Sequence, residues 1–176
     1  MLPQLMAVAV MLASIPSRPI MRVTQHGARR TLASGRKVEA PAGGWWDDAT
    51  IGSCCVTQDN GTWIMHYSGR SQGFANDVIP IGTGFVGVAT SRDGLLWEKV
   101  ACEALGGSCL APAERSPAAF DSTHLAVGHV TTGLAGPTAR RYMYYFGGGE
   151  AAPILGGRKL PRGASMAIGI ASSDDG

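Results

Sequence analysis

The segment FVGVATSRDG at residues 85–94 returns as AIGIASSDDG at residues 167–176, at an offset of 82 residues. In both copies small residues alternate with branched apolar residues and then run into an Asp-Gly pair, which is typical of a strand that enters a hairpin. Glycine adopts the positive φ that such a turn requires. The sequence therefore predicts a tight hairpin at Asp93-Gly94, followed by a strand at residues 95–100.

Two further segments repeat in the same order. WDDATIGSCCV at residues 46–56 matches FDSTHLAVGHV at residues 120–130, at an offset of 74. WIMHYSG at residues 63–69 matches YMYYFGG at residues 142–148, at an offset of 79. Three ordered matches indicate one supersecondary unit that is used twice, with insertions in the second copy.

Each unit is expected to consist of strands. In the first unit, residues 45–100, we expect strands at 49–56, 62–68, 84–91 and 95–100, and the second unit is residues 119–176. Four antiparallel strands in meander order, repeated radially, form the blade of a β-propeller. The expected fold class is all-β, an incomplete β-propeller with about two blades. The other blades are expected from the rest of the protein, because an unclosed propeller leaves a sheet face uncovered.

The composition agrees with a β-rich globular body. The 176 residues include 25 Gly and 10 Pro, 45% of the chain is hydrophobic and 16% is charged. This is too apolar for a disordered chain, and glycine has no collagen period. A net charge of +2 does not indicate a nucleic-acid partner.

The N-terminal segment differs from the body. The first 38 residues contain no Asp or Glu, and residues 1–40 carry six Lys or Arg. An acid-free, Arg-rich and Ser-rich start is typical of a transit peptide to a plastid or another organelle. The apolar run at residues 5–13 also allows a secretory signal, although it is too short to span a membrane. We therefore expect residues 1–40 to be a presequence apart from a body at 41–176, unless the gene start is misassigned.

Neither the cysteines nor the glycine-rich segments indicate a cofactor. Cys54 and Cys55 are adjacent, whereas Cys102 and Cys109 flank a glycine-rich loop and could pair. No zinc-type spacing is present, and the glycines at 147–149 are not followed by a Lys-Ser/Thr pair. The sequence predicts no cofactor and no metal.

Three motifs of the body resemble the five-bladed β-propeller glycoside hydrolase superfamily, which holds families 32 and 43 and their arabinanase-, levansucrase- and invertase-like relatives. The first motif is W-x-M-x-Y-x-G, present at residues 63–69 and again, in part, from Met143 to Gly147. The second is the hairpin G-x-A-x-S-x-D-G-x-x-W at residues 87–97, which recurs in part at 169–176. The third is the Asp that leads each first strand. The family 32 pattern W-M-N-D-P-N-G is absent.

The resemblance implies hydrolysis of glycosidic bonds, which requires two carboxylates on opposite sides of the anomeric carbon. It nominates Asp47 and Asp121 as catalytic residues, since inner strands of these propellers carry carboxylates into a central funnel. Asp48 competes with Asp47, because successive strand residues face opposite ways. The resemblance assigns no general acid within this chain. Residues near the two carboxylates are candidates for sugar binding: Trp46, Asp48, His124 and Glu150.

Two other functions fit the same residues. A noncatalytic carbohydrate-binding or scaffold propeller would keep the fold and lose the chemistry, and fold alone does not separate the two. Each Asp would then only begin a strand or cap a turn. A sialidase-like propeller is a third possibility, because its structural box S-x-D-x-G-x-x-W differs by one residue from positions 91–97. The hydrolase, the carbohydrate-binding propeller and the sialidase-like propeller all predict a carbohydrate partner, whereas a scaffold propeller does not.

Overall fold

The computed structural model describes residues 29–32, 37–39, 44–113, 116, 118–133 and 140–173. This part of the chain is built from strands, with one short 3-10 turn and no α-helix. The all-β class that the sequence predicts is therefore confirmed. The elements in chain order are β1 (Arg29–Leu32), β2 (Lys37–Glu39), β3 (Thr50–Asp59), β4 (Thr62–Arg70), β5 (Phe85–Ser91), β6 (Glu98–Ala101), the 3-10 turn (Leu105–Gly107), β7 (His124–Gly133), β8 (Arg140–Gly148), β9 (Ile154–Leu155), β10 (Arg158–Lys159) and β11 (Met166–Ser173).

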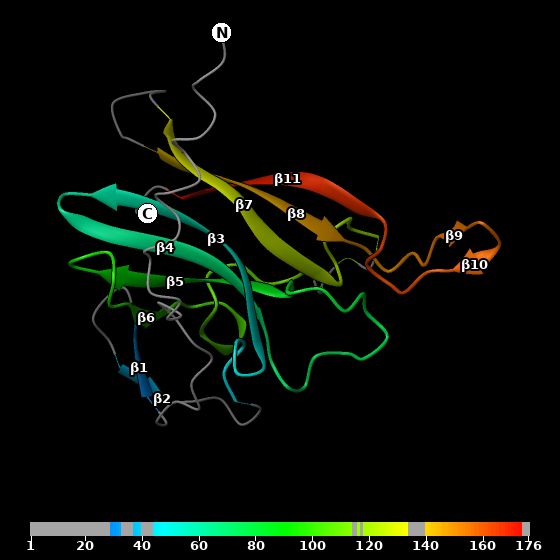
Figure 1. Cartoon of the computed structure of the whole chain (residues 1–176), viewed down its shortest axis with the longest axis horizontal. Helices are drawn as coiled ribbons and strands as arrows, with labels where there is room; N and C mark the ends of the chain where they lie inside the picture. Colours follow the sequence, from blue (N-terminus) through cyan, green and yellow to red (C-terminus); the bar gives the residue numbers. More distant parts are fainter. Residues whose placement is uncertain are drawn as a thin grey trace, which may run out of the picture.

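The strands form two main sheets and one small hairpin. The first sheet has the order β2-β1-β6-β5-β4-β3, and the second sheet has the order β11-β8-β7. Neighbouring strands are antiparallel except for β1 and β6. Figure 1 shows the second sheet, in yellow to red, lying over the cyan and green strands of the first, with the β9–β10 hairpin projecting at one end.

Both sheets repeat one backbone design. The first strand of each meander carries a bulge at the equivalent place, between Ile51 and Cys54 in β3 and between Val127 and His129 in β7. A bulge leaves backbone groups outside the ladder. In the second sheet they are bound by serines of the first, because Ser68 Oγ accepts the Val127 N–H at 3.0 Å and Ser53 Oγ donates to the Val127 oxygen at 3.2 Å.

The structure corrects the alignment of one pair of repeated strands by one residue. Tyr67 of β4 pairs with Gly87 of β5, and Tyr145 of β8 pairs with Gly169 of β11. Tyr67 is therefore equivalent to Tyr145, as in the W-x-M-x-Y-x-G motif, and not to Phe146 as the offset of 79 predicts. The strand at residues 142–148 is rich in aromatic residues, so two alignments that differ by one residue fit the first unit equally well. Only the pairing of the tyrosine with the glycine of the next strand shows which alignment is correct.

The predicted tight hairpin at Asp93-Gly94 is wrong. The pairing of β5 with β6 ends at Thr90 and Glu98, and residues 92–96 form a wider loop with Gly94 at a φ of 74°. The Asp93 Oδ1 atom accepts the N–H groups of Leu95 and Leu96 at 2.8 and 2.9 Å. An aspartate that binds downstream amides replaces the backbone hydrogen bonds of a two-residue turn, so the next strand begins only at Glu98.

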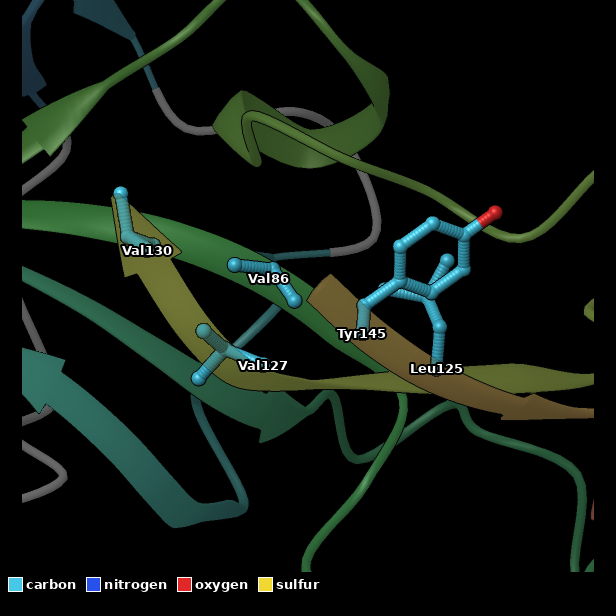
Figure 2. Packing of buried hydrophobic residues seen from close by; sticks show 5 residues of the cluster. All are labelled: Val86, Leu125, Val127, Val130 and Tyr145. Atoms are coloured by element: carbon cyan, nitrogen blue, oxygen red, sulfur yellow. The ribbon is translucent and has the colours of Figure 1, made fainter. Parts of the chain in front are cut away.

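The main apolar cluster joins the two sheets. Val86 of β5 is buried against side chains of β7 and β8, and Figure 2 shows this packing between the two layers. The buried members of the cluster are Val86, Leu125, Val127, Val130 and Tyr145. A second cluster, Trp46, Met65, Tyr67 and Ala89, lies on the opposite face of the first sheet. The first sheet is thus covered on both faces.

Part of the expected presequence belongs to the first sheet. β1 pairs with β2, and Thr31 and Leu32 of β1 pair in parallel with Val100 and Ala101 of β6. The expectation that residues 1–40 stay apart from the body therefore does not hold for these two strands. Residues 1–28 lie outside the described residues, and the presequence and its destination stay predictions. No helix among the described residues is long and apolar enough to cross a membrane.

Candidate functional site

The six candidate residues lie at the same end of their sheets. Trp46, Asp47 and Asp48 directly precede β3, and Asp121 precedes β7. His124 opens β7, and Glu150 comes just after β8 ends. Because the first strand of each meander begins where the second strand ends, the antiparallel topology gathers these residues at one end of the molecule.

Asp47 is fully buried, with 0% of its surface exposed. Its Oδ2 atom accepts hydrogen bonds from the Tyr67 hydroxyl at 2.7 Å and from Lys99 Nζ at 2.6 Å. The Lys99 side chain is itself only 7% exposed, so this is an ion pair within the protein interior. In this structure the Asp47 carboxylate is held by the fold, and its predicted catalytic role stays a prediction.

Asp121 repeats part of this arrangement but is partly exposed. Its Oδ2 atom accepts the hydroxyl proton of Tyr145 at 2.7 Å. Burial, together with this charged acceptor, raises the pKa of Tyr145 to about 12. Tyr145 therefore remains a donor throughout the physiological range, which keeps the Asp121 carboxylate oriented.

In each sheet a glycine of the second strand makes room for the Asp that precedes the first strand. A Cβ atom on Gly69 would lie 2.9 Å from the Asp47 Cβ, and one on Gly147 would lie 2.7 Å from the Asp121 Cβ. We call Asp47 with Tyr67, and Asp121 with Tyr145, the two Asp–Tyr pairs. Because each Asp packs against a glycine of the second strand, the Asp–Tyr pair anchors the chain segment that enters each sheet.

The two carboxylates lie on equivalent faces of successive sheets. Tyr145 belongs to the cluster between the sheets, so Asp121 lies on the face of the second sheet that is turned toward the first. Tyr67 belongs to the other cluster, so Asp47 lies on the face of the first sheet that is turned away from the second. Strands of the first sheet thus separate the two residues, and the predicted approach of their carboxylates within about 5–10 Å stays a prediction.

Trp46 and Asp48 have different environments. Trp46 is buried, with its ring 5.0 Å from that of Tyr67, so its indole packs inside the protein in this structure, and its predicted role in sugar binding stays a prediction. Asp48 is partly exposed, and its Oδ1 atom accepts the backbone N–H of Gln72 at 2.8 Å. Of the two adjacent carboxylates, Asp48 is the one that solvent reaches.

His124 and Glu150 both contact the segment before β11, at Gly163 and Arg162. His124 is fully buried, its Nε2 is 3.0 Å from the Gly163 oxygen, and burial lowers its pKa. Glu150 is exposed and accepts a hydrogen bond from Arg162 Nη1 at 2.5 Å. Arg162 also forms a two-pronged ion pair with Asp77, at 2.7 Å for each bond, so the loop before β5 is tied to the segment before β11.

Sequence reasoning missed Lys99 and Arg162. Their partners are remote in the sequence: Asp47 is 52 residues from Lys99, and Asp77 is 85 residues from Arg162. No local pattern identifies such pairs. The two tyrosines had a detectable signal, because each stands two residues before the repeated glycine.

His66 makes folding sensitive to acid. Burial, followed by the charge of Arg141, lowers the pKa of His66 from 6.5 to about 4. Between these values the unfolded chain binds a proton that the folded chain does not, so stability falls as the pH falls from about 6.5 toward 4.

We expect His66→Gln to flatten this part of the pH profile. At pH about 5 the wild-type loss due to His66 is about 2 kcal/mol relative to neutral pH, and the variant lacks it. Urea unfolding of both proteins at pH about 7 and about 5 measures the difference. A variant whose stability falls as steeply as that of the wild type would show that His66 is not responsible.

Among the described residues, no three His, Cys, Asp or Glu side chains gather closely enough to hold a metal ion. No protein-family model matches the chain, and no curated protein matches it. The fold and the site therefore rest on the geometry given above: an all-β body, an internal repeat and one end of the sheets that carries the candidate residues.

Proposed function

We propose that this chain supplies two sheets of a carbohydrate-active β-propeller that hydrolyses glycosidic bonds. The observation that carries the proposal is the gathering of the candidate carboxylates of both repeats at one end of the sheets. Asp48 and Asp121 are partly exposed there, and Glu150 is exposed, so a sugar at this end meets carboxylates that accept hydrogen bonds from hydroxyl groups.

The exposed face of the second sheet supports the propeller. Ile168 is the repeat equivalent of Val86, which is fully buried against the second sheet, yet Ile168 is 78% exposed. Ile170 of β11 and Tyr144, its partner in β8, are also exposed. A soluble protein rarely leaves such a contiguous apolar surface uncovered. We propose that a third sheet of the same repeat covers it, as the second sheet covers Val86.

Asp121 is the carboxylate to which we assign the chemistry. Its orientation is held by Tyr145, and it remains reachable from solvent. It would act either as a general base that deprotonates water or as a nucleophile that attacks the anomeric carbon, while Asp48 and Glu150 bind hydroxyl groups. Asp47 would have a structural role, since the ion pair with Lys99 and the burial of both residues remove it from any ligand. The general acid would come from a sheet other than these two.

A noncatalytic carbohydrate-binding or scaffold propeller is the second candidate. The specific observation that favours it is the recurrence of the Asp–Tyr pair in both sheets. A structural element is needed once in every sheet, whereas a catalytic base is needed once in the whole protein. The two candidates differ in whether bound sugar is cleaved.

We expect the chain to bind arabinan- or fructan-derived oligosaccharides weakly, and Asp121→Ala to weaken this binding roughly tenfold or more. Titration calorimetry measures the affinity, and release of reducing sugar measures cleavage. Tyr145→Phe is the matched control, because it removes the same internal hydrogen bond and keeps the carboxylate. Glu98→Ala, at an exposed strand position, controls for the loss of an acid.

Release of reducing sugar separates the two candidates, and three binding outcomes test the role of Asp121. Binding that Asp121→Ala weakens and Tyr145→Phe spares supports a direct contact of Asp121 with the sugar. Equal losses in both variants indicate a purely structural role for Asp121 and favour the noncatalytic candidate. A wild-type chain that binds none of these oligosaccharides contradicts the carbohydrate proposal.

A further inference from the structure

A closed loop follows β6 and holds two cysteines at its neck. The N–H of Cys102 donates to the Gly107 oxygen at 2.9 Å, and the N–H of Ala104 donates to the Ser108 oxygen at 3.1 Å. The chain then returns to β5, where the N–H of Cys109 donates to the Val86 oxygen at 2.8 Å. Val100 of β6 pairs with Val88 of β5, and Leu110 forms a bridge to Val86, two residues earlier in β5. The loop at residues 102–109 therefore leaves β5 and returns to it within two residues, with one cysteine at each of its ends.

The two cysteine side chains are close enough to interact, and both thiols are reduced in this structure. They share a hydrogen bond, in which the Cys109 thiol donates to the Cys102 sulfur. This hydrogen bond lowers the pKa of Cys102 and raises that of Cys109. A lower thiol pKa increases the thiolate fraction, which is the reactive form in thiol–disulfide exchange.

We propose that Cys102 and Cys109 are a redox pair that forms a disulfide across the neck of the loop at residues 102–109. The two other cysteines do not share this geometry: Cys54 and Cys55 are adjacent in β3, and Cys55 Sγ accepts the N–H of Val130 at 3.3 Å. The inference is independent of the proposed function, because it rests on this loop alone.

The oxidant is a small-molecule disulfide such as oxidised glutathione. The Cys102 thiolate attacks one sulfur of that disulfide, forms a mixed disulfide and releases one glutathione thiolate. Cys109 then loses its proton to solvent and attacks the Cys102 sulfur, which releases the second glutathione thiolate. Two protein thiols are oxidised to one disulfide, and one glutathione disulfide is reduced to two thiols.

Closing the neck would act on the aromatic residues that precede β3. A Cβ atom on Gly107 would lie 2.8 Å from the Trp45 ring, and one on Gly106 would lie 3.3 Å from the Trp46 backbone. The loop therefore covers the chain segment that leads into Asp47. A disulfide across an eight-residue loop restricts the unfolded chain, so the oxidised protein should melt roughly 5–10 °C higher than the reduced one.

Peptide mass spectrometry of the full chain tests the pairing. Trypsin cleavage after Lys99 and Arg115 puts both cysteines on one peptide, residues 100–115, whereas Cys54 and Cys55 fall on residues 38–70. The reduced protein is incubated with excess oxidised glutathione, then denatured, alkylated and digested. We expect the 100–115 peptide to lose two hydrogen atoms and to take up neither alkyl group nor glutathione.

Two variants control the result. Cys102→Ser should leave Cys109 alkylated or joined to glutathione, and Cys54→Ser should leave the 100–115 peptide oxidised as in the wild type. A wild-type peptide that carries two alkyl groups, or glutathione on both cysteines, overturns the proposal. So does an oxidised protein that melts at the same temperature as the reduced one, because the disulfide would then not restrain the loop.

Discussion

Replacing Lys99 by Met is expected to lower the free energy of unfolding by about 3–5 kcal/mol, the usual cost of removing one partner from a buried ion pair. Asp47 is fully buried and would lose the Lys99 ammonium group, which donates a hydrogen bond to its carboxylate. Removing this cation from the interior raises the free-energy cost of keeping the carboxylate charged. Urea unfolding at neutral pH measures the effect.

The control makes the same chemical change at a solvated position. Lys159→Met, on the exposed β10, should change stability by no more than about 0.5 kcal/mol. Adding Asp47→Asn to Lys99→Met should recover part of the loss, since the buried carboxylate that Lys99 neutralised is then removed as well. If Lys99→Met costs no more than Lys159→Met, the Asp47–Lys99 pair does not hold the first sheet together.

Gly87→Ala is expected to cost at least about 3 kcal/mol, although alanine is the smallest possible replacement. Its Cβ would overlap the indole of Trp46, with the ring carbon Cη2 only 2.7 Å away. Trp46 is buried and packs against Tyr67, so the indole can accommodate the new Cβ only if its neighbours shift as well. Urea unfolding, with circular dichroism to verify the β-sheet signal, measures the loss.

Gly73→Ala is the matched control, because a Cβ at that glycine would meet nothing within 4 Å. Its stability should stay within about 1 kcal/mol of the wild type. If Gly87→Ala does not fold, the double variant Gly87→Ala with Trp46→Leu should restore folding, since it removes the overlapping ring. A stable Gly87→Ala protein would contradict the close packing of Trp46 on β5.

The strands could be predicted from the sequence because the residues that pack on them recur in the same order in both units. The repeated glycine of β5 and β11 lies beneath an aromatic residue in each sheet: Trp46 over Gly87, and Phe120 over Gly169, where a Cβ would lie 2.6 Å from the Phe120 ring. Each unit thus needs an aromatic-Asp pair before its first strand and a glycine in its third strand, because the aromatic ring packs on that glycine. This packing explains why the pattern occurs in both units. The bulges in β3 and β7 also recur in both units, but no residue type in the sequence marks them.

The features that sequence reasoning missed depend on remote partners or on competing hydrogen bonds. Asp93-Gly94 was recognised as a turn signal, but the capture of two backbone amides by the Asp93 side chain widened the loop. Asp47 was identified as the start of a strand, but its exposure depends on Lys99, a strand residue far along the chain. The sequence locates an acid at a strand end, and only the packing determines whether a ligand reaches it.

A double-mutant cycle on each Asp–Tyr pair tests most directly the claim that the two sheets are copies of one unit. The cycles combine Asp47→Asn with Tyr67→Phe, and Asp121→Asn with Tyr145→Phe, with stability measured by urea unfolding at neutral pH. Hydrogen bonds to a charged acceptor predict a coupling free energy of about 1.5–3 kcal/mol in each sheet. Additive effects in either sheet would contradict the repeat as the basis of the fold, because the Asp–Tyr contact would then stabilise only one of them.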